Sequence, residues 1–210
     1  MANTARENIL TKIKQALAKP VPVPFPASQG NESVFLPSKQ ELEVEFAENF
    51  TRLEGRFSFC ANEQELVEQL QALITSRKWV KIYSRETNLQ DRLSQAGFTS
   101  AYSDDVATCD AAITGCESLI ARTGTMIMSS AQLSGRTVSV YAPVHICIAY
   151  TKQLVYDIGE GLQQIRETYG QQFPSMVTLA TGPSRTADIE KTLVVGVHGP
   201  KEVFCFLVDS

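Results

Sequence analysis

Residues 56–83 read RFSFCANEQELVEQLQALITSRKWVKIY, and this stretch decides the fold class. The first five residues, 56–60, include two phenylalanines and predict a short strand. Asn62 is typical of a helix N-cap. The apolar residues that follow recur at helical spacing, at Leu66, Leu70, Leu73 and Ile74. Residues 79–83 predict a second strand, so the segment has the strand–helix–strand order of an α/β domain.

The rest of the chain continues this alternation and then changes to consecutive strands. A capping box at Ser38 and Glu41 predicts a helix that Gly55 ends. Further helices are predicted at 88–96 and 154–169, and strands or β-rich segments at 110–114, 124–129, 137–141, 145–150, 176–180 and 203–208. This order indicates an α/β fold with a mixed sheet flanked by helices.

The first 37 residues differ in character from the rest. Thr4 and Glu7 have capping-box spacing, and Ile9, Ile13 and Leu17 follow at every fourth position. We therefore predict an amphipathic helix over about residues 5–18. Four of the nine prolines lie within 20–26 and favour a stiff, extended strap. We expect two parts: an arm over 1–37 with a net charge of +2, and an α/β domain over 38–210 with a net charge of −6.

Composition excludes several functional classes. The 210 residues carry a net charge of −4, without the basic character typical of nucleic-acid-binding proteins. The five cysteines include no C-x-x-C pair, so we expect no metal site and no cofactor on this chain, and we interpret the thiols as small buried apolar groups. We find no signal-peptide core and no run of about 18 apolar residues, which predicts a cytoplasmic protein without a transmembrane segment.

The first candidate site follows the predicted strand at 110–114. Here Glu117 is a carboxylate near a strand end, where it could act as a nucleophile or a general base. Thr123, Gly124 and Thr125 follow and offer hydroxyl groups and close backbone approach. The alternative is that Glu117 is a first-turn helix residue stabilised by the helix dipole, and this segment alone favours that alternative.

The second candidate site is the stretch TGPSRTADIE at 181–190. A predicted strand runs into it and a helix is expected to begin there, which would expose N–H groups to an anion. Ser184, Thr186 and the cation Arg185 would add donors for a carboxylate or a phosphate. The alternative is a simple helix cap in which Arg185 pairs with Asp188 or Glu190.

Two histidines and one further arginine complete the candidates. His198 and Gly199 lie in the stretch VHGP at 197–200, and His145 follows Pro143. Two separated histidines make a weak metal site, and a hydrogen-bonded structural role is the more common alternative. Arg136 precedes a predicted β segment and faces either a cleft or, by default, solvent.

Five motifs in fixed order resemble the lactate-utilisation protein C family, the LUD domain. They are TGCE at 114–117, TGT at 123–125, PVHI at 143–146, TGPSRTADIE at 181–190 and GVHGPKE at 196–202. The resemblance extends from about residue 40 to the C-terminus, and the 181–190 string is its most specific part. It implies a fold similar to the sugar-phosphate isomerase and CoA-transferase group. It also implies a part in the oxidation of L-lactate to pyruvate, beside two partner subunits that carry iron–sulfur clusters.

The chain departs from the family pattern at Arg122, where many members carry an acidic residue. The change makes the local site more cationic and weakens the case for a carboxylate-based mechanism. We therefore favour a non-redox subunit that binds a small carboxylate or phosphate. The expected anion-binding residues are Thr123, Gly124, Thr125, Arg136, Thr181, Gly182, Ser184, Arg185, Thr186, His198 and Gly199. The alternative is a stand-alone isomerase or acyl-transferase-like enzyme with Glu117 as the catalytic residue.

Overall fold

The computed structural model describes residues 5–18, 37–38, 40–186 and 193–210. The chain divides into two compact units, Met1–Pro37 and Ser38–Ser210. In the first unit, α1 (Ala5–Leu17) confirms the predicted helix, and Ile9, Ile13 and Leu17 on its apolar side are exposed. Thr4 and the proline-rich strap lie outside the described residues. None of the described helices has the length and apolar composition needed to cross a membrane.

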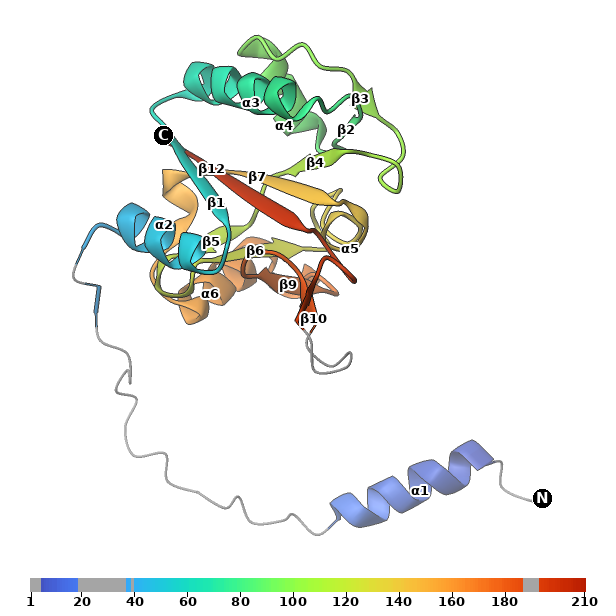
Figure 1. The fold of residues 1–210 in the computed structure, drawn as a ribbon. Helices are drawn as coiled ribbons and strands as arrows, with labels where there is room; N and C mark the ends of the chain where they lie inside the picture. The colour runs from blue at the N-terminus through green and yellow to red at the C-terminus, as the bar shows by residue number, and fades with distance from the viewer. Residues whose placement is uncertain (1–4, 19–36, 39, 187–192) are drawn as a thin grey trace. The chain divides into compact units, whose positions relative to one another are not determined.

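The second unit is built on a six-stranded sheet in which every neighbouring pair is parallel (Figure 1). Its strands, in spatial order, are β1 (Arg56–Cys60), β12 (Glu202–Val208), β7 (Val144–Tyr150), β4 (Ala111–Thr114), β2 (Ile82–Tyr83) and β3 (Tyr102–Ser103). Helices flank this sheet, which confirms the predicted α/β class. The antiparallel pairs lie in two smaller sheets, one of which also contains a parallel pair and is therefore mixed.

Different layers cover the two faces of the parallel sheet (Figure 1). One face packs against α3 (Glu63–Arg77) and α4 (Thr87–Gln95) through a core that includes Leu70, Ile113 and Ile146. The other face packs against α2 (Leu42–Arg52) and a second sheet, with α6 (Ile158–Tyr169) beyond it. The second sheet has the order β8 (Leu154–Val155), β5 (Ser118–Ile120), β6 (Thr125–Ser129) and β9 (Val177–Ala180).

Helix caps follow the sequence at some positions and differ at others. The Asn62 side chain accepts a hydrogen bond from the Glu65 N–H and caps α3, as predicted. The predicted capping box at Ser38 is wrong, because α2 begins at Leu42 and its N-cap residue, Glu41, makes no side-chain cap bond. The Ser38 hydroxyl instead donates to the Glu45 carboxylate.

Three further predictions of secondary structure are wrong, each because packing against, or pairing with, distant parts of the chain overrides local preference. Residues 138–141 form the short helix α5 (Val138–Tyr141), whose Val138 is fully buried, and not a strand. The segment predicted as a helix from 154 begins with β8, which pairs with β5, and Asp157 then caps α6. The helix expected near Ser184 is, over its described part, the strand β10 (Arg185–Thr186), which pairs with β11 (Val194–Val195).

Two glycines bring the loops of the second layer against the end of α2. Gly124, which ends the short 3-10 helix η1 (Ala121–Thr123), has a φ of +59°, and an added Cβ would lie 2.4 Å from the Phe50 nitrogen. Gly182 has a φ of +78°, and an added Cβ would lie 2.4 Å from the Leu53 carbonyl oxygen. Neither distance is possible for a real side chain, so both positions need glycine.

We expect Gly124→Ala to destabilise the fold far more than Gly97→Ala does. Gly97 has a φ of +100° and nothing within 4 Å of an added Cβ, so its variant isolates the conformational strain, about 1–2 kcal/mol. Gly124→Ala adds a collision with the α2 backbone, about 1–3 kcal/mol more. Chemical denaturation measures both, and equal losses of unfolding free energy would show that the contact with α2 is loose.

Candidate functional site

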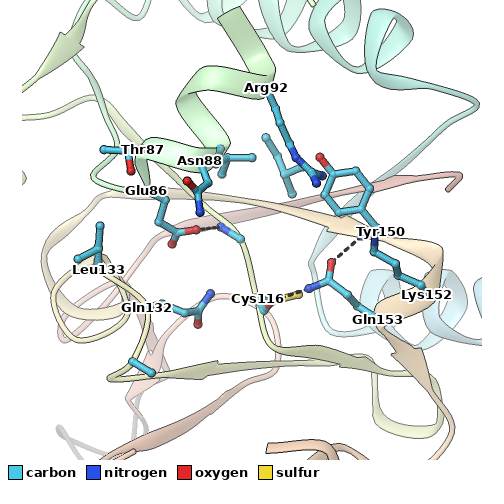
Figure 2. Close-up of a pocket in the computed structure, with 14 residues that line it drawn as sticks. Glu86, Thr87, Asn88, Arg92, Cys116, Gln132, Leu133, Tyr150, Lys152 and Gln153 are labelled. Atoms are coloured by element: carbon cyan, nitrogen blue, oxygen red, sulfur yellow. Dashed lines mark hydrogen bonds between the residues drawn. The ribbon is translucent and has the colours of Figure 1, made fainter. Parts of the chain in front are cut away.

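The parallel sheet has a switch point between β2 and β4. The chain leaves β2 toward α4 on one face, and it leaves β4 toward the second sheet on the other face. In open α/β sheets, ligands bind beyond the carboxyl ends of the strands at such a point. A cavity of about 460 Å³ lies there (Figure 2), and we call it the carboxyl-edge cavity. Its lining includes Glu86, Asn88, Arg92, Gln132, Tyr150 and Lys152.

Glu86 supplies the acidic group of the carboxyl-edge cavity. It occupies the N-cap position of α4, but its carboxyl group turns to β4, where Oε2 accepts the Gly115 N–H at 2.9 Å. Its other oxygen, Oε1, is buried and has no hydrogen-bond partner among the described residues. Burial is the main cause that raises the pKa of Glu86 to about 7, against the Gly115 hydrogen bond, which lowers it. Glu86 is therefore able to gain or lose a proton near neutral pH.

Cationic groups lie on the other side of this cavity around the Tyr150 ring (Figure 2). The Arg92 guanidinium lies 5.0 Å from the ring centroid and the Lys152 ammonium 5.4 Å from it. Glu63 partly compensates Arg92 at 3.7 Å and accepts the Tyr150 hydroxyl at 3.0 Å. In the described part of the chain, Lys152 has no carboxylate within ion-pair distance, so its charge is available to an anion.

Three cysteines that are far apart in sequence meet beneath the cavity. Cys147 on β7 pairs in register with Cys205 on β12, and Cys116 follows β4, the other neighbour of β7. Hydrogen bonding from Cys116 and Cys205 lowers the pKa of Cys147. All five cysteines are buried and none forms a disulfide, which agrees with their interpretation as buried apolar groups. Across the described residues, no group of three or more His, Cys, Asp or Glu is placed to hold a metal ion.

A second cavity, of about 390 Å³, lies near the amino ends of β7 and β12. It gathers five of the candidate anion-binding residues, together with the second histidine: Arg136, His145, Thr181, Gly182, Ser184 and His198. None of the described residues that line it is acidic, although the whole chain has a net charge of −4. We call it the acid-free cavity.

His145 lies at the inner wall of the acid-free cavity and is only 1% exposed. Its Nε2 lies 2.8 Å from the Thr114 hydroxyl, which donates to the Gly115 carbonyl oxygen at 2.8 Å. Burial lowers the pKa of His145, so the ring is neutral at pH 7. His145 therefore offers hydrogen bonds and no charge, and Arg136 supplies the cationic group of this cavity.

The remaining candidate residues lie beside this cavity or away from it. The hydroxyls of Thr123, Thr125 and Thr181 form a chain, with oxygen separations of 2.7 and 2.8 Å, that ends at the cavity wall. Thr186 pairs with Val194 in the β10–β11 hairpin, and Gly199 is buried outside the lining.

Arg185 is engaged elsewhere than in the cavity. Its guanidinium donates to the Leu53 carbonyl oxygen at 2.8 Å and lies 3.3 Å from the Glu54 carboxylate. The structure thus places an ion pair at Glu54, where the sequence suggested Asp188 or Glu190, which lie outside the described residues. Arg185 ties the 181–186 loop to the end of α2.

Glu117 lies between β4 and β5 and not in a helix. One of its carboxylate oxygens accepts the Ser129 hydroxyl at 2.5 Å and the Tyr169 hydroxyl at 3.0 Å. Nearby, Arg122 forms a two-contact ion pair with Asp157, the N-cap residue of α6, at 2.7 and 2.8 Å. Arg122, the departure from the family pattern, therefore joins η1 to α6.

Sequence reasoning missed Glu86 and Lys152, the two charged groups that define the carboxyl-edge cavity. Glu86 follows a predicted strand by three residues, and Lys152 follows another by two. A position just beyond a strand was the available signal. It becomes informative only when the strand order places β2, β4 and β7 side by side.

As the pH rises, we expect the unfolding free energy of the protein to fall relative to the unfolding free energy of the Glu86→Gln variant. Glutamate ionises near 4.5 in its ordinary state and near 7 at this site, so the unfolded chain loses the proton first. Between these values the folded state is progressively destabilised, by about 2–3 kcal/mol in total. Denaturation at pH 5 and 8.5 measures the difference between the two proteins, and a difference independent of pH would contradict the assignment.

Comparison with known proteins places the chain in a family. The LUD domain family matches residues 99–208, more than half of the chain. An uncharacterised protein of Neisseria meningitidis serogroup B is 27% identical over 95% of this chain and 91% of that protein. Lactate utilization protein C 1 of Bacillus mycoides is 29% identical over 70% of this chain and 71% of its own length.

A shorter alignment and a crystal structure extend the comparison. Lactate utilization protein C of Shouchella clausii is 37% identical, over 48% of this chain and 44% of that protein. The crystal structure of a DUF162 family protein from Deinococcus radiodurans has a TM-score of 0.60. It shares 19% identity over 80% of this chain and 96% of its own, which shows a common fold. The chain belongs to the LUD domain family.

Proposed function

We propose that this protein is a non-redox subunit of a lactate-utilisation system and binds a small carboxylate in the acid-free cavity. Relatives named lactate utilization protein C support the process. The observation that carries the ligand class is the lining of the cavity, which combines Arg136, two histidines and hydroxyl groups without a described acidic residue. Lactate and pyruvate present the groups that such a lining recognises: a carboxylate next to a second oxygen.

The geometry of the cavity suits a small anion. Arg136 is exposed, donates to the Ser175 hydroxyl, and has no carboxylate partner in the described part of the chain. An arginine with free donors binds carboxylates with two parallel hydrogen bonds. Ser184 and Thr181 add hydroxyl groups, and the neutral His145 adds a hydrogen-bonding wall. None of the described lining residues carries a carboxylate that would repel an anion.

The electrons of lactate oxidation are assigned to partner subunits. Conversion of lactate to pyruvate releases two electrons and two protons, which need an acceptor. The cysteines of this chain are buried thiols without the sequence spacing of cluster ligands, and the proposal therefore assigns the iron–sulfur clusters to two partner subunits. Glu117, the catalytic residue of the alternative enzyme, is held by Ser129 and Tyr169, which favours a positioned structural carboxylate.

We expect Arg136→Gln to weaken the binding of pyruvate by about 1–3 kcal/mol, the magnitude of a charge-assisted hydrogen bond. Isothermal titration calorimetry on the full chain measures it. Arg166→Gln is the matched control, because Arg166 is exposed on α6 outside the cavity linings described above. Equal affinities for both variants would remove the acid-free cavity as the carboxylate site.

Arg185→Ala is expected to leave pyruvate affinity unchanged and to lower the unfolding free energy by about 1 kcal/mol, because it removes a hydrogen bond and a surface ion pair. The same titration and a denaturation curve measure the two quantities. A loss of affinity without a loss of stability would instead make Arg185 an anion ligand.

The partner assignment is tested in cells. A tagged full-length chain, isolated from its native host grown on L-lactate, should carry two iron–sulfur proteins with it, and its deletion should prevent growth on L-lactate. A chain that is isolated alone, from a host that grows on lactate without it, would contradict the assignment.

A further inference from the structure

The carboxyl-edge cavity is separate from the acid-free cavity and does not depend on the proposed function. Its volume, about 460 Å³, lies in the range of pockets that enclose drug-sized ligands. Figure 2 shows Glu86 on one side of the cavity, and Arg92, Tyr150 and Lys152 on the other. The two kinds of polar group are therefore arranged for a ligand with different chemistry at its two ends.

The cationic side of the cavity selects an anionic group. Arg92 is partly neutralised by Glu63, whereas Lys152 has no ion pair over the ranges that the structure describes. Both cations lie against the Tyr150 ring, which fixes their position without reducing their charge. A carboxylate, sulfonate or phosphate bound on this side would be attracted by the one positive charge, on Lys152, that no acidic group among the described residues compensates.

The acidic side selects a hydrogen-bond acceptor. Oε2 of Glu86 accepts a hydrogen bond from the Gly115 N–H, so the proton of the neutral carboxyl group lies on Oε1. Oε1 is the buried oxygen without a partner, and a buried polar atom that stays unpaired is costly. A small rotation of the Glu86 side chain would turn Oε1, which solvent does not reach in this conformation, into the cavity, where a carbonyl or ether oxygen of a ligand would accept its proton. The charged or titratable groups around Glu86 are Glu117 and Cys147 behind it, and Arg92, Tyr150 and Lys152 across the cavity.

We infer that the carboxyl-edge cavity binds an elongated organic anion, whose charged group lies at Lys152 and whose far end presents an oxygen acceptor to Glu86. The body of the ligand packs against apolar side chains of the lining, Leu89, Leu133 and Ile148. Binding favours the neutral form of Glu86, so the ligand and one proton bind together.

A pair of rigid benzoates tests the acceptor. In 4-acetylbenzoate a carboxylate and a ketone oxygen lie at opposite ends of a ring, and 4-isopropylbenzoate has the same number of heavy atoms without the ketone. Calorimetric titration of the full chain at pH 6 should show 4-acetylbenzoate binding about three- to tenfold more tightly. Equal affinities, or no binding of either compound at millimolar concentration, would overturn the proposal.

The pH dependence tests Glu86. Affinity for 4-acetylbenzoate should fall about tenfold from pH 6 to pH 8 as Glu86 ionises. Glu86→Gln should bind equally at both pH values, because the amide oxygen can accept the Gly115 N–H while the amide nitrogen donates to the ketone. An unchanged pH dependence in Glu86→Gln would overturn the role of Glu86.

The location of the ligand is tested with one variant and one competitor. Lys152→Gln should weaken 4-acetylbenzoate binding about tenfold, whereas Lys78→Gln, at the end of α3 outside both cavities, should not change it. Saturating pyruvate should not displace 4-acetylbenzoate. Displacement by pyruvate, together with unchanged binding in Lys152→Gln, would place both ligands in the acid-free cavity and overturn the second site, while leaving the proposed function intact.

Discussion

The end of α2 rests against two loops at positions where no side chain has room, and the rest of the second layer depends on this contact. Gly124 and Gly182 both adopt positive φ and bring their backbones against Phe50 and Leu53. Asn49 adds hydrogen bonds to the carbonyl oxygens of Ala121 and Arg122. These contacts place the hydroxyl chain of Thr123, Thr125 and Thr181 at the wall of the acid-free cavity. At these two motif positions, glycine is thus a packing requirement that positions polar groups.

The parallel sheet separates two cavities of different chemistry. One opens at the carboxyl ends of β2, β4 and β7 and contains a carboxyl group opposite two cations; the other opens at the amino ends of β7 and β12. A short polar path joins them, from Glu86 to Gly115, from Thr114 to the carbonyl of Gly115, and from Thr114 to His145. Its members lie on or just beyond adjacent strands, so the sheet holds the two cavities at a fixed distance from one another.

Much of the fold was predictable from the sequence, because apolar periodicity is a local property. The helices at 5–17, 63–77 and 87–95 and the strands at 111–114, 144–150 and 202–208 follow it closely. The failures at 138–141, 154–155 and 185–186 share one cause: short segments whose conformation is set by packing or by a partner distant in sequence. The site depends even more on such partners. Glu86 and Lys152 become neighbours of one cavity only through a strand order that local patterns do not contain.

The cysteines also show that local sequence can predict the burial of a residue without predicting its neighbours in space. Their spacing correctly predicted burial, but their meeting at Cys116, Cys147 and Cys205 follows from the register of β7 with β12 and from the loop after β4. Residue type predicted the chemistry that each side chain offers, and the tertiary register determined which side chains lie together. Thr181, Ser184, Arg136 and His198 were chosen for their chemistry, and the fold brings these four around one cavity.

A crystal structure of the full chain grown with pyruvate tests whether the acid-free cavity is a carboxylate site. We expect electron density for pyruvate in this cavity, with its carboxylate at Arg136 and its keto oxygen near Ser184 or His198. Pyruvate bound only in the carboxyl-edge cavity, or an acid-free cavity that stays without pyruvate at saturating concentration, would exclude the acid-free cavity as the carboxylate site.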